Sequence, residues 1–200
     1  TGAITDAGFE AGSDIGIALD IAATQLWRGG RYQLALENRA VSAEQLHAIY
    51  ARWLERYPIV SIEDPFAEHD TAAMAAFTKA HGGRLQIVGD DLFVTSASKL
   101  DPALANTVLL KPNQVGTVSE TLACWRAAQE KGMRAIVSAR SGETEDVSIV
   151  HLAVGWGVPQ LKVGSFSRSE RMAKWNEGLR IEEALGAKAL PYPARKLFRR

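Results

Sequence analysis

Short hydrophobic runs alternate with longer amphipathic stretches along the whole chain. The short runs are rich in Ile, Val and Leu and mostly lack a polar residue at every second position. This pattern is typical of strands that are buried on both faces of a parallel sheet. We therefore expect six strands, at residues 15–19, 59–62, 85–88, 108–110, 135–137 and, more weakly, 160–163.

Helices are predicted between and after these runs. Ser42-Ala43-Glu44-Gln45 reads as a capping box, in which the serine accepts from the helix and the glutamine reaches back. We expect this helix to end near residue 57, because Pro58 follows it. Gly29-Gly30 predicts a hairpin turn over residues 28–32. Further helices are expected at 72–80, 118–131 (stopped by Gly132), 143–154 and 169–185.

Repeated strand–helix units predict an α/β fold with a parallel sheet covered by helices. Such a sheet either stays open, as in a doubly wound fold, or closes into a TIM-type (β/α) barrel. The two common glycine-rich phosphate-binding motifs are absent, which weakens a dinucleotide or nucleotide interpretation. A full barrel has eight strands in about 250 residues, so a barrel built from these 200 residues would be incomplete.

The composition excludes several classes of partner. Because 23 Lys+Arg balance 23 Asp+Glu, we expect no nucleic acid and no membrane surface as a partner. No apolar run approaches the roughly 18 residues of a membrane span. The single cysteine, Cys124, excludes an internal disulfide and fits a reducing compartment, so we expect a cytoplasmic protein.

The two ends of the chain carry expectations of their own. The chain starts at Thr1 rather than Met, which favours processing or excision from a longer protein. Residues 1–187 are expected to form one barrel-like domain. Residues 188–200 are expected to form a tail whose basic cluster consists of Arg195, Lys196, Arg199 and Arg200.

Acidic residues end three of the predicted strands. Asp20, Glu63 and Asp90 each follow their own hydrophobic run. Because the carboxyl ends of parallel strands share one edge, these three carboxylates are expected to converge. Their mutual repulsion would be relieved by a hard divalent cation, and Mg²⁺ prefers oxygen ligands in octahedral geometry. The pattern therefore predicts a magnesium site.

Basic residues end the remaining strands. Lys111 follows the fourth run, Arg140-Ser141 follows the fifth, and Lys162 lies in the sixth. Cations opposite a metal site suit an anionic small-molecule substrate. A lysine surrounded by positive charge loses its proton more readily than a free lysine, which suits a general base.

These and other polar residues also have structural interpretations. A single acid after a strand is more often a helix cap, but three acids followed by three bases is a pattern that chance seldom gives. Asp64 and Asp91 stay open between caps and groups that orient the metal ligands. The four histidines follow no strand and are expected to be structural or surface residues: His47, His69, His81 and His151.

At these residues the sequence resembles the enolase (phosphopyruvate hydratase) family. The resemblance runs in order through nearly the whole chain, and the combination of segments is far more specific than any one motif. The segments are ALDIAA (18–23), SIEDPF (61–66), GDDL (89–92), LLKPNQVG (109–116), SARSGETED (138–146) and SRSER (167–171).

The resemblance implies the fold of the enolase C-terminal barrel, with about six of its eight strands. It also implies that Asp20, Glu63 and Asp90 hold Mg²⁺ and that Lys111 removes the C2 proton of 2-phosphoglycerate. A lysine or histidine base with one or two Mg²⁺ is the pattern of this superfamily.

The substrate-binding residues follow from the same resemblance. Lys162 matches the lysine that holds the substrate carboxylate. Arg140 and Ser141 match the residues that contact the phosphate. The chain departs from the family at Ala139, where the family carries a pocket histidine, and at Val163 and Phe166, where it usually has Thr and Pro.

The implied activity is that of a glycolytic lyase, the reversible Mg²⁺-dependent dehydration of 2-phosphoglycerate to phosphoenolpyruvate. We expect a C-terminal fragment that is inactive alone, since the family's acid for hydroxide departure and its mobile loops have no match here. The parent protein is expected to be a homodimer. Two alternatives are an enolase-superfamily relative with an altered acid substrate and a non-catalytic remnant that serves as a binding or structural module.

Overall fold

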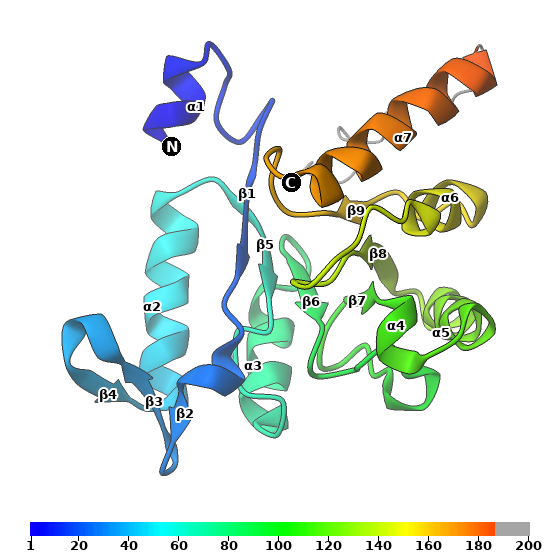
Figure 1. Ribbon diagram of the computed structural model, residues 1–200. Helices are drawn as coiled ribbons and strands as arrows, with labels where there is room; N and C mark the ends of the chain where they lie inside the picture. Colours follow the sequence, from blue (N-terminus) through cyan, green and yellow to red (C-terminus); the bar gives the residue numbers. More distant parts are fainter. Residues whose placement is uncertain (187–200) are drawn as a thin grey trace. The chain divides into compact units, whose positions relative to one another are not determined.

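The computed structural model describes residues 1–186, which fall into two compact units (Figure 1). The first unit consists of Thr1–Phe93 and Asp101–Thr107. The second consists of Val94–Leu100 and, among the described residues, 108–186. Residue 187 and the predicted basic tail at 188–200 lie outside the described residues.

The first unit is built on three neighbouring strands, β1 (Ile17–Asp20), β5 (Ile59–Glu63) and β6 (Gln86–Gly89). Both neighbouring pairs are parallel. In the register Asp20 lies opposite Glu63, and Glu63 lies opposite Val88. All four residues of β6 are buried, as the unbroken hydrophobic pattern predicts.

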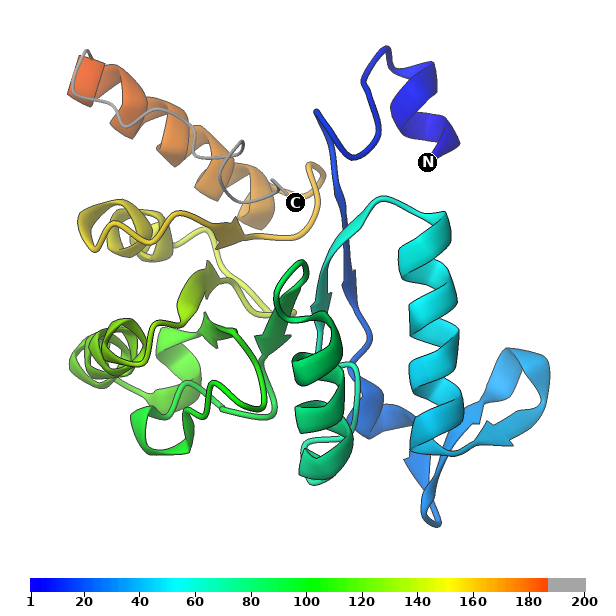
Figure 2. The ribbon, with the colours of Figure 1, turned by 180° about the vertical axis from the view of Figure 1, so that it is seen from behind.

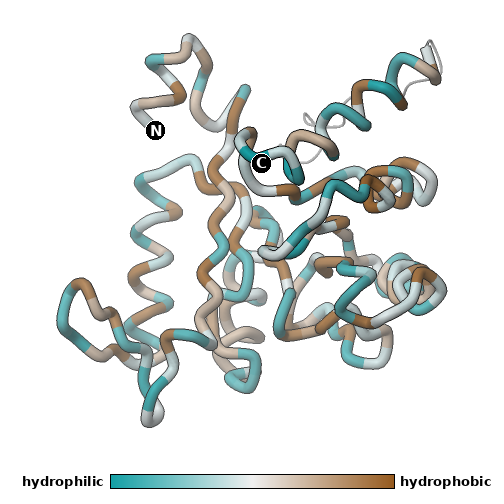
Figure 3. Tube along the Cα trace, viewed as in Figure 1, coloured by the Kyte–Doolittle hydropathy of each residue, from teal (hydrophilic) through white to brown (hydrophobic). Residues whose placement is uncertain are grey.

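Two long helices, α2 (Ala43–Arg56) and α3 (Thr71–His81), accompany these strands and pack against each other. The predicted capping box is present, because Ser42 accepts from the backbone N–H of Gln45 and the Gln45 side chain accepts from Ser42. Hydrophobic and hydrophilic residues alternate along α2, whereas β1 and β5 are themselves mostly hydrophobic (Figure 3). The buried face of α2 consists of Leu46, Ile49, Tyr50 and Leu54.

A small antiparallel sheet replaces the single hairpin turn that the sequence predicts at 28–32 (Figure 2). Its strands are β2 (Trp27–Arg28), β3 (Arg31–Leu34) and β4 (Arg39–Val41). Tyr32 anchors this sheet, since its buried hydroxyl accepts from the Ala67 N–H and donates to the Asp70 carboxylate. Short elements complete the unit: α1 (Gly2–Asp6) and the 3-10 turns η1 (Ala23–Leu26) and η2 (Ala35–Glu37).

The second unit contains the other three predicted strands in the order β7 (Thr107–Leu110), β8 (Arg134–Ser138) and β9 (Leu161–Lys162). The pair β8 and β9 is parallel, with Ser138 opposite Lys162. The first residue of β7, Thr107, belongs to the first unit and the rest of the strand to the second.

The helices of the second unit follow its strands. They are α4 (Pro112–Val115), α5 (Val118–Glu130), α6 (Ser148–Gly155) and α7 (Ser169–Leu185), with the 3-10 turn η3 (Ala97–Lys99). Gly132 ends α5 as predicted: it adopts φ +68°, and the next N–H bonds back to the Ala128 carbonyl. The predicted helix start at residue 143 is wrong, because α6 begins at Ser148.

None of the helices formed by residues 1–186 is long and apolar enough to cross a membrane. Cys124 is a buried free thiol, and burial raises its pKa to about 11, which keeps it protonated. Residues 1–186 contain the six strands of the main sheet that the sequence predicts.

Candidate active site

Three carboxylates mark the carboxyl ends of the strands in the first unit. Asp20 is the last residue of β1, Glu63 is the last residue of β5, and Asp90 directly follows β6. Glu63 is 5% exposed and Asp90 is 9% exposed, so both acids are buried in the unit. The register places Asp20 and Glu63 side by side, as the sequence predicts.

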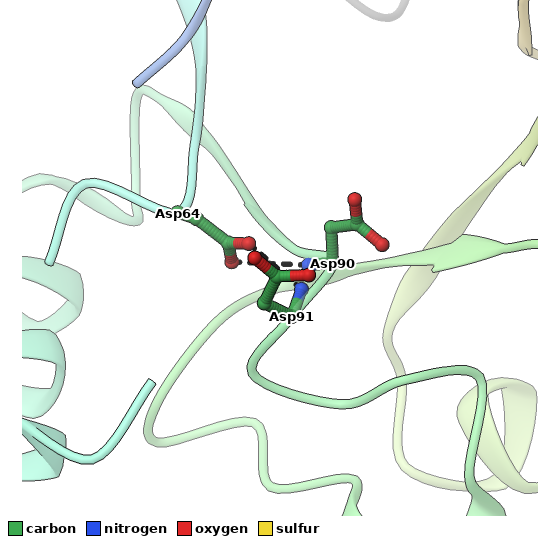
Figure 4. Close-up of side chains that lie close together, drawn as sticks. All are labelled: Asp64, Asp90 and Asp91. Atoms are coloured by element: carbon green, nitrogen blue, oxygen red, sulfur yellow. Dashed lines mark hydrogen bonds between the residues drawn. The ribbon is translucent and has the colours of Figure 1, made fainter. Parts of the chain in front are cut away.

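Asp64 ties two of these strand ends together (Figure 4). Its carboxylate accepts from the backbone N–H of Asp90 at 3.0 Å and from that of Asp91 at 2.8 Å. Its own N–H donates to the carbonyl of Val88 in β6. Asp64 adopts φ +41°, a left-handed conformation that is uncommon outside glycine and that occurs here directly after the strand.

The environment of Asp64 disfavours its charged form. Burial raises the pKa of Asp64 to about 7, against the two N–H hydrogen bonds, which lower it. The charges of Asp90 and Asp91 raise this pKa further. Side-chain oxygens of these three aspartates lie within 4.8 Å of one another.

The donor set at this edge fits a hard divalent cation. All its side chains are carboxylates, and Mg²⁺ is bound in proteins through carboxylate oxygens and water. Asp64 already accepts two N–H hydrogen bonds, so its geometry favours an orienting role for it. Of the expected ligands, Asp90 belongs to the close group of aspartates, whereas Asp20 and Glu63 share the adjacent strand ends.

Lys111 follows β7 at the position that caps α4. Its backbone N–H donates to the hydroxyl of Thr95, and that hydroxyl donates to the side-chain oxygen of Gln114 at 2.8 Å. Thr95 is fully buried, and both Thr95 and Val94 adopt left-handed φ values of +56° and +44°. Left-handed β-branched residues are strained, so the surrounding structure must hold this turn in place.

The remaining expected substrate residues lie at the ends of β8 and β9. Arg140 and Ser141 follow β8, and Lys162 is the last residue of β9. The two strand ends are joined where the Ala139 N–H donates to the Lys162 carbonyl at 2.9 Å. Within the second unit, the structure therefore brings the expected phosphate and carboxylate contacts to adjacent strand ends.

Comparison with known proteins agrees with this arrangement. Residues 1–199 match the family described as Enolase, C-terminal TIM barrel domain. The enolase of Anaplasma marginale (strain St. Maries) is 48% identical over 194 residues. The chain belongs to the enolase family. The match covers 95% of this chain and 44% of the relative, so the chain spans less than half of the length of that enolase.

Enolase family membership confirms the predicted fold class, an incomplete TIM-type barrel with six of the eight strands among the described residues. It also confirms the family that the sequence resemblance indicates. Ala139, the departure from the enolase motif, is 7% exposed at the end of β8, so this position faces the interior.

Sequence reasoning missed several residues around this enolase-type edge. Thr95 carries no recognisable signal, because nothing in a Val-Thr-Ser loop predicts two left-handed residues. Arg171 lies in the SRSER segment, yet its contacts with residues about 30 positions away depend on the folded structure. The missed set comprises Thr95, Glu143, Arg171 and Lys174.

Two of the histidines, His47 and His81, lie on helices rather than at strand ends. His47 and His81 pair between α2 and α3 with 3.0 Å between their Nε2 atoms. Burial lowers the pKa of both histidines, and both contact the ring of Phe77. This arrangement agrees with the structural role expected for them.

Proposed function

We propose that the chain contributes to the reversible, Mg²⁺-dependent dehydration of 2-phosphoglycerate to phosphoenolpyruvate, the enolase step of glycolysis. The observation that carries this proposal is the series of carboxylates at the ends of β1, β5 and β6 in a chain of the enolase family. Three acids at adjacent strand ends, of which Glu63 and Asp90 are buried and Asp20 is exposed, suit a cation more than they suit a folded core.

Asp20, Glu63 and Asp90 would hold the magnesium ion, and Asp64 would orient them through the backbone of Asp90 and Asp91. When bound, the ion supplies positive charge for the carboxylate of the substrate. That charge matters because a proton next to a carboxylate is very weakly acidic, and its removal creates a second negative charge on the same group.

Lys111 is proposed as the base that takes the C2 proton. Its backbone is fixed through Thr95, so the start of its side chain has one defined position. Lys162 is proposed to bind the substrate carboxylate and to neutralise its growing charge. Arg140 and Ser141 are proposed to bind the phosphate, for which the planar guanidinium group is well suited.

The activity is proposed in the setting of a complete enolase architecture, because the chain spans 44% of the Anaplasma marginale relative. The group that assists hydroxide departure is not among the residues assigned here, so the isolated chain is proposed to form little phosphoenolpyruvate. A homodimer and a cytoplasmic location are proposed for the complete protein, on the family resemblance and the single cysteine respectively.

The test is a chimera in which this chain replaces the matched region of the Anaplasma marginale enolase. We expect it to form phosphoenolpyruvate from 2-phosphoglycerate when Mg²⁺ is present, as followed by ultraviolet absorbance. Lys111→Ala should abolish turnover, and Lys131→Ala, at an exposed lysine beyond α5, should not. A folded chimera that binds Mg²⁺ yet shows no turnover would contradict the proposal.

Ala139 favours a second candidate, an enolase-superfamily enzyme for a different 2-hydroxy or 2-phospho acid. Alanine offers no side-chain donor to a phosphate and has a smaller side chain than histidine, and Ala139 is buried. The chimera and its Ala139→His variant distinguish the two candidates. Higher 2-phosphoglycerate turnover in the histidine variant favours a divergent enolase, whereas turnover of a larger acid that this variant abolishes favours the altered substrate.

Mg²⁺ titration addresses the third possibility, a non-catalytic remnant. Binding that Asp90→Ala abolishes would count against a remnant, and absence of binding would favour it.

A further inference from the structure

One guanidinium group of α7 joins the two strand-end segments that carry the expected substrate residues. Arg171 donates from Nη1 to the carbonyl of Arg140 at 2.8 Å and to the carbonyl of Val163 at 2.9 Å. It donates from Nη2 to the carbonyl of Ser141 at 2.9 Å. A single side chain therefore fixes the segment after β8 against the segment after β9.

Lys174, one turn further along the same face of α7, holds the same loop from a second point. Its Nζ lies 2.8 Å from the Glu143 carboxylate and donates to the Thr144 carbonyl at 2.6 Å. The other oxygen of Glu143 accepts from the Arg140 N–H at 2.7 Å. The ammonium group thus reaches the backbone of Arg140 through one intervening carboxylate.

Most of these bonds are partly shielded from solvent, which strengthens them, whereas the bond to Ser141 is exposed. The Lys174 side chain is 0% exposed and the Arg171 side chain is 11% exposed. The segment after β9 passes close over the arginine: a Cβ at Gly164, which adopts φ +109°, would lie 3.6 Å from the Arg171 Cδ. Glycine therefore permits both the turn and the close contact.

The loop between β8 and α6 has little regular structure of its own to fix it. Residues 139–147 form neither helix nor strand, so side-chain contacts from α7 determine where Arg140 and Ser141 lie. Val163, the third carbonyl bound by Arg171, directly follows Lys162. The fork of Arg171 thus sets the spacing between the expected phosphate contacts and the expected carboxylate contact.

We propose that Arg171 is a positioning residue that sets this spacing and so selects a 2-phospho acid, with Glu143 and Lys174 as its support. The inference rests on the proposed function. In 2-phosphoglycerate the phosphate and the carboxylate are attached to one carbon, whereas in 3-phosphoglycerate they lie one carbon further apart. A fixed spacing between the two contact points favours the first acid over the second.

The first test measures binding of both acids to the 200-residue chain in Mg²⁺ by titration calorimetry. Arg171→Lys keeps the charge but loses the planar fork of donors. We expect it to weaken the binding of 2-phosphoglycerate about tenfold and to reduce the preference for 2-phosphoglycerate over 3-phosphoglycerate. Mg²⁺ affinity should not change, because the expected metal ligands belong to the first unit. The control Arg126→Lys, at an exposed arginine of α5, should bind like the parent chain.

The second test does not depend on the substrate. Amide hydrogen exchange in Arg171→Lys should be faster at residues 140–146 and 163–165 and unchanged in α2 and α3. If the parent chain binds neither acid, the same titrations are made with the chimera, and a folded chimera that binds neither acid would count against the proposed function. The exchange rates still decide whether Arg171 fixes the two segments. Should Arg171→Lys not fold, Glu143→Gln removes the supporting charge, and we expect faster exchange of the same loop. Parent-like exchange in the folded variant would overturn the proposal, as would an unchanged preference between the two acids.

Discussion

The acidic edge of the first unit and the basic edge of the second unit are held in place by different means. In the first unit the strand register brings Asp20 and Glu63 level, and the buried carboxylate of Asp64 fixes the backbone at Asp90. In the second unit Arg140 and Ser141 lie on a loop that α7 holds through Arg171. The first arrangement depends mainly on backbone pairing between neighbouring strands, and the second depends on side-chain donors from one helix.

This difference shows which kind of site residue tolerates change nearby. Strand-end carboxylates are positioned by a ladder of backbone hydrogen bonds, so single side-chain substitutions leave them close to their places. Loop residues held by one guanidinium and one ammonium group move when that side chain is lost. Substitutions in the two units should therefore fail in different ways, with lost metal binding in the first unit and lost stability or loop order in the second.

The largest effect on stability is expected from Lys174→Met in the second unit. This change leaves the Glu143 carboxylate without its buried partner, and breaking such a pair typically costs about 3–5 kcal/mol. Urea denaturation measures the loss. The double variant Glu143→Gln/Lys174→Met should recover part of the stability. A loss no larger than about 1 kcal/mol, as for an exposed ion pair, would refute a role for this pair in holding the loop.

In the first unit the largest effect is expected from Asp90→Ala, measured as Mg²⁺ affinity by calorimetry. Loss of a direct ligand should lower the Mg²⁺ affinity by more than the roughly 10–100-fold that is typical when a residue that only orients the ligands is substituted. Stability should not fall with it, because one of several clustered negative charges is removed. The matched control is Glu55→Gln, at an exposed acid of α2. Equal Mg²⁺ affinities of the two variants would argue against a metal site at this edge.

A smaller effect is expected from Asp64→Asn. The amide offers one acceptor oxygen, and its NH₂ group faces a backbone N–H where the carboxylate accepted a hydrogen bond. Mg²⁺ affinity should fall about tenfold, in the range of outer-partner substitutions. Asp70→Asn alters another carboxylate that binds backbone, at the start of α3, and should leave the affinity as it was. If both variants bind Mg²⁺ alike, Asp64 does not orient the ligands.

The smallest effect is a pH dependence confined to the first unit. Burial lowers the pKa of His47 and His81 from their ordinary value of 6.5, so the folded state binds fewer protons than the unfolded state below that pH. The contribution of these two histidines to stability is therefore fully present above about pH 6.5 and is lost as the pH drops. The raised pKa of Asp64 acts in the opposite direction, so the measurement is the difference in melting temperature between His81→Phe and the parent chain, which should shift in favour of His81→Phe as the pH drops. His151→Gln, at an exposed histidine of α6, should behave like the parent chain. An equally steep fall in His81→Phe would place the sensitivity elsewhere.

Much of the fold follows from local sequence signals. Short runs of Ile, Val and Leu predict the buried strands. The Ser42–Gln45 capping box predicts the start of α2, and the structure confirms it. The helix predicted from residue 143 starts at Ser148 because Glu143 and Thr144 bind Lys174 instead of continuing a helix. That contact spans 30 residues, so no local pattern reveals it.

The same distinction applies to the candidate site. Asp20, Glu63, Asp90 and Lys111 are recognisable because each ends a strand, and strand ends can be read from the sequence. The groups that hold them are different: the orienting bonds of Asp64 need the folded strand ends, and Thr95 and Arg171 act across turns or between loops. The sequence therefore predicts which side chains act more readily than it predicts what positions them.

The most direct measurement for the central claim is exchange of the C2 hydrogen of 2-phosphoglycerate with solvent deuterium, followed by nuclear magnetic resonance in the chimera with the Anaplasma marginale enolase. With Mg²⁺ present, we predict exchange in the parent chimera and in Lys131→Ala, and none in Lys111→Ala. Mg²⁺ affinity should be the same in all three proteins. Parent-like exchange in Lys111→Ala would contradict the account, because the proton would then be removed by another group.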